Sequence, residues 1–125
     1  MKKEAQFEKA FAKLAALKGE QYFKIPDPQM LTARNRYQNK EQKRPFDGVF
    51  VTKNGTWCLE FKVNYNQLSP HQKLNKMKVD SINGKFAVVT EIEKKSGTVY
   101  KLQIGDETTI YDNLSYMITG LIQTI

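Results

Sequence analysis

Residues 46–63 read FDGVFVTKNGTWCLEFKV, which is two apolar runs joined by a short polar turn. Both runs are rich in β-branched and aromatic residues, so each indicates a strand. Asn54-Gly55 fits a two-residue turn in which positive φ is needed. A turn centred there predicts a hairpin in which Asp47 lies opposite Lys62 or close to it.

The rest of the chain alternates between helical and extended patterns. The expected helices are 4–18, 70–83 and 113–121, and the expected strands are 20–25, 46–52, 57–63, 86–90, 98–104 and 108–111. A long polar connection over 27–44 separates the first two strands. This order, α-β-β-β-α-β followed by β-β-α, predicts an α/β (α+β) fold, with a mixed central sheet flanked by helices in a single domain over 1–125.

Two helix starts have recognisable caps. Ser69 is expected to cap the middle helix, with Pro70 in the first helical position and Gln72 completing a capping box. Asp112 is expected to cap the last helix. The apolar residues of the middle helix that we expect to face inward are Leu74, Met77 and Ile82.

The chain carries an excess of positive charge, with 20 Lys and Arg against 13 Asp and Glu among 125 residues. Residues 1–46 hold 11 of the basic residues and 5 of the acidic ones. Such clustering predicts salt-sensitive binding to nucleic acid, because bound cations release counterions from the phosphate backbone. A surface that merely keeps the protein in solution is the alternative.

Other classes of protein are excluded by composition. Cys58 is the single cysteine, which rules out an internal disulfide framework and a zinc site built from cysteines. No apolar run approaches the roughly 18 residues of a membrane span, and the first residues lack the apolar segment of a signal peptide. We therefore expect a cytoplasmic protein with no membrane partner.

The residues that indicate chemistry are Asp47, Glu60 and Lys62. Glu60 and Lys62 point to the same face of one strand because side chains alternate along a strand. The hairpin returns Asp47 toward them. Charged groups inside an apolar run are costly unless they are paired or bind an ion. A partly exposed Glu–Lys pair on an edge strand is the alternative.

The order of short motifs resembles the PD-(D/E)XK nuclease superfamily. Pro45-Phe46-Asp47 is followed, after the hairpin, by Glu60-Phe61-Lys62, and the first helix carries Ala5-Gln6-Phe7-Glu8. Leu68-Ser69-Pro70-His71-Gln72 is similar to a segment of Holliday-junction resolvases of the bacterial and phage type, and of virus-type replication-repair nucleases. The resemblance covers about residues 4–91 and implies a restriction-endonuclease-like core, αβββαβ.

The resemblance also implies metal-dependent cleavage of phosphodiester bonds. Asp47, Glu60 and the backbone carbonyl of Phe61 would bind Mg²⁺, which prefers oxygen ligands, and Mn²⁺ is expected to substitute. The metal would polarise the phosphate and acidify a bound water. Lys62 would orient that water or help deprotonate it, and would offset developing negative charge. No small-molecule cofactor is expected beyond the metal.

Two further residues have both a structural and a functional interpretation. Glu8 matches a helix-borne acid that many superfamily members place near the metal, with Glu4 as the less favoured substitute. A solvated carboxylate is the alternative for Glu8. Gln72 would lie beside the catalytic lysine or contact a phosphate, and it can equally satisfy the helix end. His71 is expected to be a surface residue or a phosphate contact.

Basic residues on both sides of the site are expected to bind DNA through its phosphates. They lie in the connection before Asp47 and on the middle helix: Arg34, Arg36, Lys40, Lys43, Arg44, Lys73 and Lys76. A merely solvated loop is the alternative for the connection. Residues 92–125 match no specific motif, and their apolar residues, such as Tyr116 and Leu121, would form either core or a dimer contact.

The function that the resemblance implies is a structure-selective endodeoxyribonuclease, in particular a Holliday-junction resolvase. Symmetric cutting of a four-way junction needs two active sites and therefore a homodimer. Two alternatives stay open. One is a nuclease of the same superfamily that acts on forks, nicks, duplex or single strands. The other is a catalytically silent, basic DNA-binding module.

Neutralising the basic connection provides a test of the DNA path. We expect the triple change Arg34→Gln, Arg36→Gln and Arg44→Gln to weaken binding to every DNA sequence and to flatten its salt dependence, because phosphate contacts carry little sequence information. Fluorescence anisotropy across a salt series measures this slope. A slope equal to that of the unmodified protein would put the DNA path elsewhere.

Overall fold

A computed structural model describes residues 3–26 and 44–124. The helices are α1 (Lys3–Leu17), α3 (Pro70–Ser81) and α4 (Leu114–Thr124). The strands are β1 (Gln21–Lys24), β2 (Gly48–Thr52), β3 (Gly55–Val63), β4 (Phe86–Lys94), β5 (Gly97–Ile104) and β6 (Glu107–Tyr111). Within these ranges, no helix is long and apolar enough to cross a membrane.

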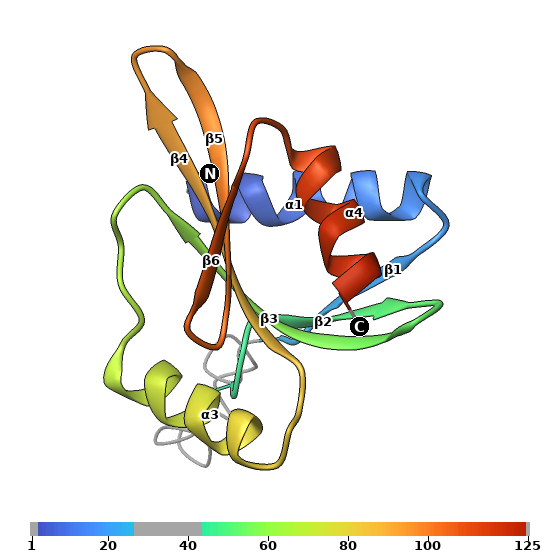
Figure 1. The fold of residues 1–125 in the computed structure, drawn as a ribbon, viewed down its shortest axis with the longest axis vertical. Helices are drawn as coiled ribbons and strands as arrows, with labels where there is room; N and C mark the ends of the chain where they lie inside the picture. Colours follow the sequence, from blue (N-terminus) through green and yellow to red (C-terminus); the bar gives the residue numbers. More distant parts are fainter. Residues whose placement is uncertain (1–2, 27–43, 125) are drawn as a thin grey trace, which may run out of the picture.

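The six described strands form one sheet in the order β1-β2-β3-β4-β5-β6. Neighbouring strands are antiparallel except β3 and β4, which are parallel because α3 carries the chain back between them. The expected mixed sheet flanked by helices is confirmed. Figure 1 shows α1 and α4 together on one side of the sheet and α3 apart from them.

The two faces of β3 have opposite character. Trp57, Leu59 and Phe61 are buried in a core shared with α1 and α4. Glu60 and Lys62 alternate with them and therefore point to the other face, where α3 lies. The α4 end is attached to this strand directly, since the Trp57 indole donates to the Leu121 carbonyl at 2.9 Å.

An aromatic cluster holds α1 against the first three strands. The ring of Phe11 lies edge-on to the rings of Tyr22, Phe50 and Phe61, with centroids 5.8, 5.1 and 5.2 Å away. Such edge-to-face pairs add to the free energy gained from burial alone. The cluster therefore fixes the strands β2 and β3 that carry the acidic residues.

The hairpin register differs from the one expected. Gly55 has φ of 151° and pairs with Thr52, so the turn consists of Lys53 and Asn54 rather than Asn54-Gly55. The Thr52 hydroxyl accepts from the amides of Asn54 and Gly55, both at 3.1 Å. The Asn54 amide group also donates to the Ile122 carbonyl of α4 at 2.9 Å, which fixes the turn.

This register brings Asp47 beside Glu60 instead of Lys62. The last pair of the hairpin is Gly48 with Leu59, so Asp47 lies one step beyond it, and its amide donates to the Leu59 carbonyl at 3.0 Å. The expectation that Asp47 faces Lys62 was wrong by two residues. The two carboxyl groups are closer in register than the sequence suggested.

The orientation of α3 was also predicted wrongly. Leu74 and Met77 of α3 and its C-cap residue Ile82 are 49%, 68% and 79% exposed rather than inward. Polar side chains face the protein instead: Gln72 contacts Glu60, and the Asn75 amide group donates to the Pro45 carbonyl at 2.9 Å. The Glu60 carboxyl group and the Pro45 carbonyl are acceptors beside the helix, so the side chains that can donate to them are directed inward.

The helix caps give one confirmation and one correction. The capping box of Ser69 and Gln72 is present at the start of α3. At the start of α4, the Asn113 side chain accepts from the Tyr116 amide at 2.9 Å, so Asn113 rather than Asp112 supplies the cap. Leu121 lies in the core, whereas Tyr116 is 64% exposed.

Replacing Phe11 tests the role of the aromatic cluster. Phe11→Ala is expected to lower the free energy of unfolding by about 3–5 kcal/mol, because a buried ring is lost and a cavity remains. Phe23→Ala is the matched control, since Phe23 is 55% exposed and its loss should cost less than about 1 kcal/mol. Urea unfolding measures both, and equal losses would contradict the proposed packing.

Candidate active site

Two acidic residues are buried side by side where β2 begins. Asp47 is 4% exposed and Glu60 is 2% exposed. Backbone hydrogen bonds hold Asp47 from both sides: its amide donates to Leu59, and its carbonyl accepts from the Ile25 amide at 2.9 Å. The position of its carboxylate is therefore set by β1 and β3 together.

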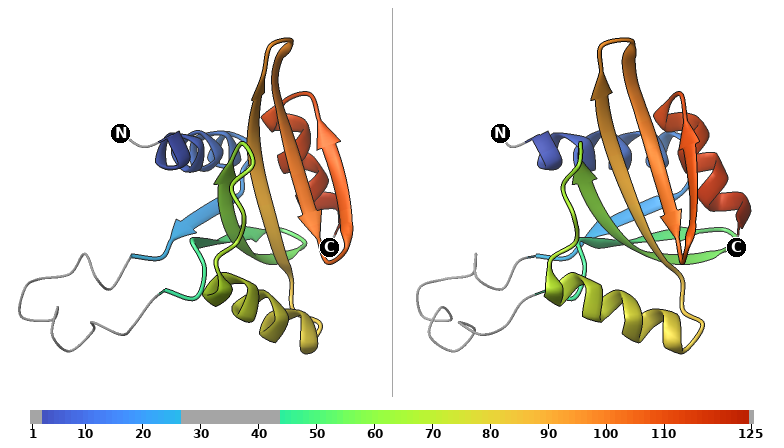
Figure 2. Two further views of the ribbon diagram at one scale, coloured as in Figure 1. Left: turned by 90° about the vertical axis from the view of Figure 1, so that its left-hand side faces the viewer. Right: turned by 60° about the vertical axis from the view of Figure 1, so that its left-hand side comes forward.

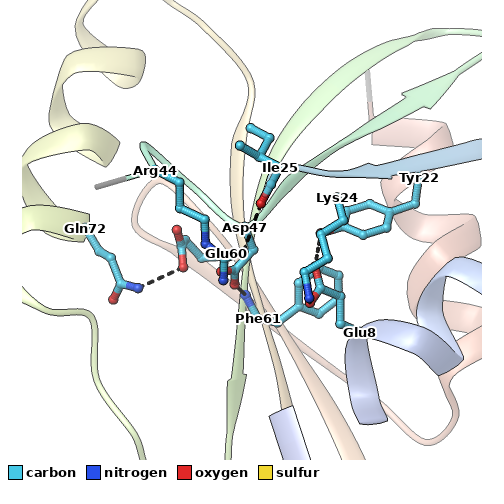
Figure 3. A network of polar contacts seen from close by, with 9 residues as sticks. All are labelled: Glu8, Tyr22, Lys24, Ile25, Arg44, Asp47, Glu60, Phe61 and Gln72. Carbon is cyan, nitrogen blue, oxygen red and sulfur yellow. Dashed lines mark hydrogen bonds and ion pairs between the residues drawn. The ribbon is translucent and has the colours of Figure 1, made fainter. Parts of the chain in front are cut away.

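The Asp47 carboxylate has two donors. Its Oδ2 accepts from the Phe61 backbone amide at 2.7 Å, and its Oδ1 accepts from Arg44 Nη2 at 2.6 Å. Arg44 also donates through Nη1 to the Ile25 carbonyl at 3.0 Å. Figure 3 shows Arg44 reaching over this end of the sheet. Arg44 thus compensates the buried negative charge of Asp47.

The Glu60 carboxyl group points toward α3. Gln72 Nε2 donates to its Oε2 at 3.0 Å, while Gln72 Oε1 accepts from the Ser69 amide at 2.9 Å. One side chain therefore caps the helix and orients Glu60. The expected cap is confirmed, and the contact with Glu60 is one that the sequence did not predict. The cap fixes the end of α3, and through it the Gln72 amide group, relative to the acid.

Glu60 holds its proton more tightly than an ordinary glutamate. Burial, and then the neighbouring Asp47 carboxylate, raise the pKa of Glu60 to about 8, although Lys62 and Arg44 act in the opposite direction. Two adjacent buried carboxylates repel each other when both are charged, which disfavours the second charge. In the absence of a metal, a proton on Glu60 relieves this repulsion.

Lys62 lies two residues further along the same face of β3. It is half-buried, it pairs in register with Thr90 of β4, and it borders a cleft of about 310 Å³. Its positive charge acts on Glu60 and also on Glu4 of α1. The expected group of Asp47, Glu60 and Lys62 is therefore assembled at one end of the sheet.

Glu8 belongs to a neighbouring group. It is 7% exposed, it accepts a hydrogen bond from the Tyr22 hydroxyl, and its Oε1 lies 3.5 Å from the Lys24 ammonium. Burial and the Glu8 contact raise the pKa of Tyr22. Figure 3 shows Glu8, Tyr22 and Lys24 on one side of Phe61, apart from Glu60 and Gln72. Glu8 is thus close to the site without contacting Glu60.

The pKa of Glu4 is affected by the charged groups of the site. Burial raises the pKa of Glu4, Lys62 lowers it, and the carboxylates of Asp47 and Glu8 raise it. The acid that we expected to be the less favoured substitute therefore lies within electrostatic range of both Lys62 and Asp47. The N-terminal half of α1 presents two acids to this end of the sheet.

The residues expected to bind DNA have different surroundings. Arg44 pairs with Asp47, and Lys76 pairs with Asp80 at 2.8 Å. Lys73 is exposed. His71 lies in hydrogen-bond range of Asn75, at 3.2 Å. The other four residues, Arg34, Arg36, Lys40 and Lys43, lie outside the described residues.

Sequence reasoning missed three polar partners. Arg44 was assigned to DNA and not to Asp47, although a spacing of three residues permits the pair. Tyr22 and Lys24, which contact Glu8, alternate along β1 with no motif to single them out. Only the pairing of β1 with β2 brings them beneath α1.

The donor set of the site fits a hard divalent cation. In the described ranges, no three Asp, Glu, His or Cys side chains converge, so the ligands would be the carboxylates of Asp47 and Glu60 with the Phe61 carbonyl. The carbonyl and amide of one strand residue point to the same side, and the Phe61 amide already contacts Asp47. All three ligands are oxygens, as Mg²⁺ prefers. The cation would compete with Arg44 for Asp47 Oδ1.

No protein-family model matches this chain, and neither does any curated protein. The function is therefore inferred from the residues and the geometry of the site.

The buried acid pair predicts an unusual pH dependence of stability without metal. Because the pKa of Glu60 is raised in the folded protein, folding takes up a proton between the unfolded value of about 4.3 and about pH 8, and stability falls as pH rises through that window. Glu60→Gln removes this loss. Its free energy of unfolding should exceed that of the unmodified protein by about 2–4 kcal/mol above about pH 8 and by little near pH 5.

Urea unfolding in EDTA at several pH values measures this difference. Glu107→Gln is the matched control, because Glu107 is exposed and should show no such trend. A gap between Glu60→Gln and the unmodified protein that stays constant with pH would contradict the raised pKa of Glu60.

Proposed function

We propose that this protein is a Mg²⁺-dependent, structure-selective endodeoxyribonuclease of the PD-(D/E)XK superfamily, with four-way DNA junctions as its substrate. One observation carries the proposal: the carboxyl groups of Asp47 and Glu60 are buried together, with Lys62 on the same strand face as Glu60. Burying two adjacent acids is costly for folding alone, so such a pair indicates a functional site.

The order of elements supports the proposal. The expected core αβββαβ corresponds to α1, β1, β2, β3, α3 and β4, with β3 and β4 parallel. Asp47 comes directly before β2, and Glu60 and Lys62 lie on β3. The segment with the capping box opens α3 and contacts Glu60 through Gln72. Three of the motifs thus contribute a group to one end of the sheet.

The chemistry follows from the residues present. Asp47, Glu60 and the Phe61 carbonyl would hold Mg²⁺, and the bound metal would supply a Lewis acid for the phosphate and acidify a water. Gln72 orients the Glu60 carboxyl group. Lys62 would orient the attacking water or help deprotonate it, and would offset negative charge on the phosphate.

Two features concern the DNA partner. Lys73 is exposed near the start of α3, on the side of the sheet that carries Glu60, and can contact a phosphate close to the site. Cutting both strands of a junction symmetrically requires two copies of the site, so the proposed active form is a homodimer.

The ion pair of Arg44 and Asp47 favours a second candidate. With Oδ1 of Asp47 already 2.6 Å from a guanidinium, the acid can be neutralised without a metal. A basic module that binds DNA and does not cleave it would need nothing more. Metal dependence separates the two candidates, because only the nuclease requires Mg²⁺.

A cleavage assay tests the proposal directly. The substrates are a four-way junction, a fork, a linear duplex and a single strand, each across a Mg²⁺ titration with EDTA as the blank. Asp47→Asn, Glu60→Gln and Lys62→Gln should each reduce cleavage of the junction by at least about a hundredfold, because each removes a group acting on the transition state. DNA binding in EDTA should stay largely intact for Asp47→Asn and Glu60→Gln.

Asp112→Asn is the control for a lost carboxylate, since Asp112 is exposed and leads into α4. It should cleave at the normal rate. Cleavage by Glu60→Gln at that rate would refute the assigned site. Binding without cleavage of any substrate would favour the DNA-binding module, and cleavage without preference for the junction would favour another PD-(D/E)XK nuclease.

A further inference from the structure

A cleft of about 310 Å³ opens beside Lys62, on the sheet face opposite α1 and α4. Its floor crosses three strands, where Lys62 of β3 pairs with Thr90 of β4 and Thr90 pairs with Lys101 of β5. Neighbouring strands lie about 4.8 Å apart, so the Cα atoms of the two lysines are about 10 Å apart, with Thr90 between them. Residues paired in register point to the same face, and both lysines line the cleft.

The cleft is built to receive an anion. Lys73 of α3 adds a third ammonium group to those of Lys62 and Lys101, and no acidic side chain of the described chain lines the space. None of these three lysines has a carboxylate within 4.0 Å among the residues that the structure describes. Three lysines around a space that no acidic side chain of the described residues lines suit a phosphate group.

The remaining lining suits a nucleobase. Asn66, Gln67 and Gln103 supply amide groups, each of which both donates and accepts hydrogen bonds. Val88 contributes an apolar surface. At the rim, Tyr65 is 78% exposed and offers a ring on which a base can stack. The lysines can bind the phosphate of a nucleotide, and the amide groups and the Tyr65 ring can bind its base.

The wall of the cleft is held in place by the turn that follows β3. Asn64 has φ of 54°, a left-handed conformation that turns the chain out of the strand. Its amide donates to the Glu91 carbonyl at 2.7 Å, and its Oδ1 accepts from the Glu93 amide at 3.1 Å. These bonds attach the segment carrying Tyr65 and Gln67 to β4, so the cleft is formed before any ligand arrives.

We infer that this cleft binds one unstacked nucleotide of the DNA strand that the acid pair cleaves, an inference that rests on the proposed nuclease function. Its volume lies at the small end of the range for ligand sites and leaves room for about one nucleotide. A base stacked and paired in a duplex cannot enter without leaving the helix. Lys62 borders the cleft and shares a strand face with Glu60, so the nucleotide lies next to the cleaved phosphate.

The inference defines the class of substrate. Unpairing a base costs least where the duplex is already interrupted, as at a branch point or beside an unpaired nucleotide. The cleft would therefore select interrupted DNA over continuous duplex, by shape and phosphate contacts rather than by sequence. Lys101 and Tyr65 become specificity residues that no nuclease motif contains.

A binding experiment in EDTA tests the cleft without cleavage. The probes are two short duplexes of equal length, one fully paired and one with a single unpaired 2-aminopurine nucleotide. Fluorescence anisotropy gives both affinities, and 2-aminopurine emission reports the stacking of the unpaired base. The unmodified protein should bind the interrupted duplex about tenfold more tightly, with a change in 2-aminopurine emission.

Two variants alter the cleft, and a third variant, outside the cleft, is the matched control. Lys101→Gln and Tyr65→Ala should each reduce the preference for the interrupted duplex about five- to tenfold, and Tyr65→Ala should also remove most of the emission change. Lys94→Gln removes the same charge near the tip of the β4–β5 hairpin, which Figure 2 shows at the end of the sheet away from α3. It should leave the preference unchanged. Tyr65 is largely exposed, so its replacement should not disturb folding.

Equal affinity of the unmodified protein for both duplexes would overturn the inference. So would a preference that neither Lys101→Gln nor Tyr65→Ala reduces. These outcomes are separate from the nuclease proposal, because binding in EDTA does not depend on cleavage. Mg²⁺-dependent cutting by a protein without this preference would leave the acid pair as the active site and remove the nucleotide cleft.

Discussion

The structure depends on the burial of two carboxyl groups beside each other, at the point where β2 begins and β3 passes it. Asp47 and Glu60 are both almost fully buried, and adjacent buried charges of like sign repel strongly. Three groups reduce this repulsion: the Arg44 guanidinium, the Phe61 amide, and the proton that Glu60 retains. A divalent cation would replace that proton. The arrangement is costly for a chain that only needs to fold, which is why it is best understood as a site.

Strand β3 joins this costly site to the core that supports it. Its odd-numbered residues pack against α1 and α4, and its even-numbered residues point to the face with α3. Because one strand serves both, the aromatic cluster around Phe11 positions the acid pair through a rigid backbone. On that face, the Glu60 carboxyl group and the Pro45 carbonyl accept from Gln72 and Asn75, so α3 directs these polar side chains inward while Met77 is exposed.

The parallel pair of β3 and β4 brings acid pair and cleft together. Because α3 carries the chain back across the sheet, the segment that joins β3 to α3 lies at the carboxyl end of β3. Open α/β sheets commonly bind ligands at this end. The acids and the cleft then share Lys62 as a common border. Lys101 joins from β5, in the part of the chain that carries no nuclease motif. The C-terminal strands, which gave no functional signal, thus supply half of the charged floor.

Local patterns in the sequence were enough to predict the order of the helices and strands, the capping box at Ser69, and the face shared by Glu60 and Lys62. Each of these depends on neighbours within a few residues, through backbone preference or the two-residue period of a strand. Local patterns did not predict the length of β4, which runs to Lys94 rather than to residue 90. Contacts between distant segments decided the rest. The hairpin register was set by Thr52 and by the bond from Asn54 to α4, which moved Asp47 from Lys62 to Glu60. The partners of Glu8, and the position of Lys62 and Lys101 on either side of Thr90, likewise depend on which strands pair. A shift of register by a single residue would have turned these side chains to the other face of the sheet.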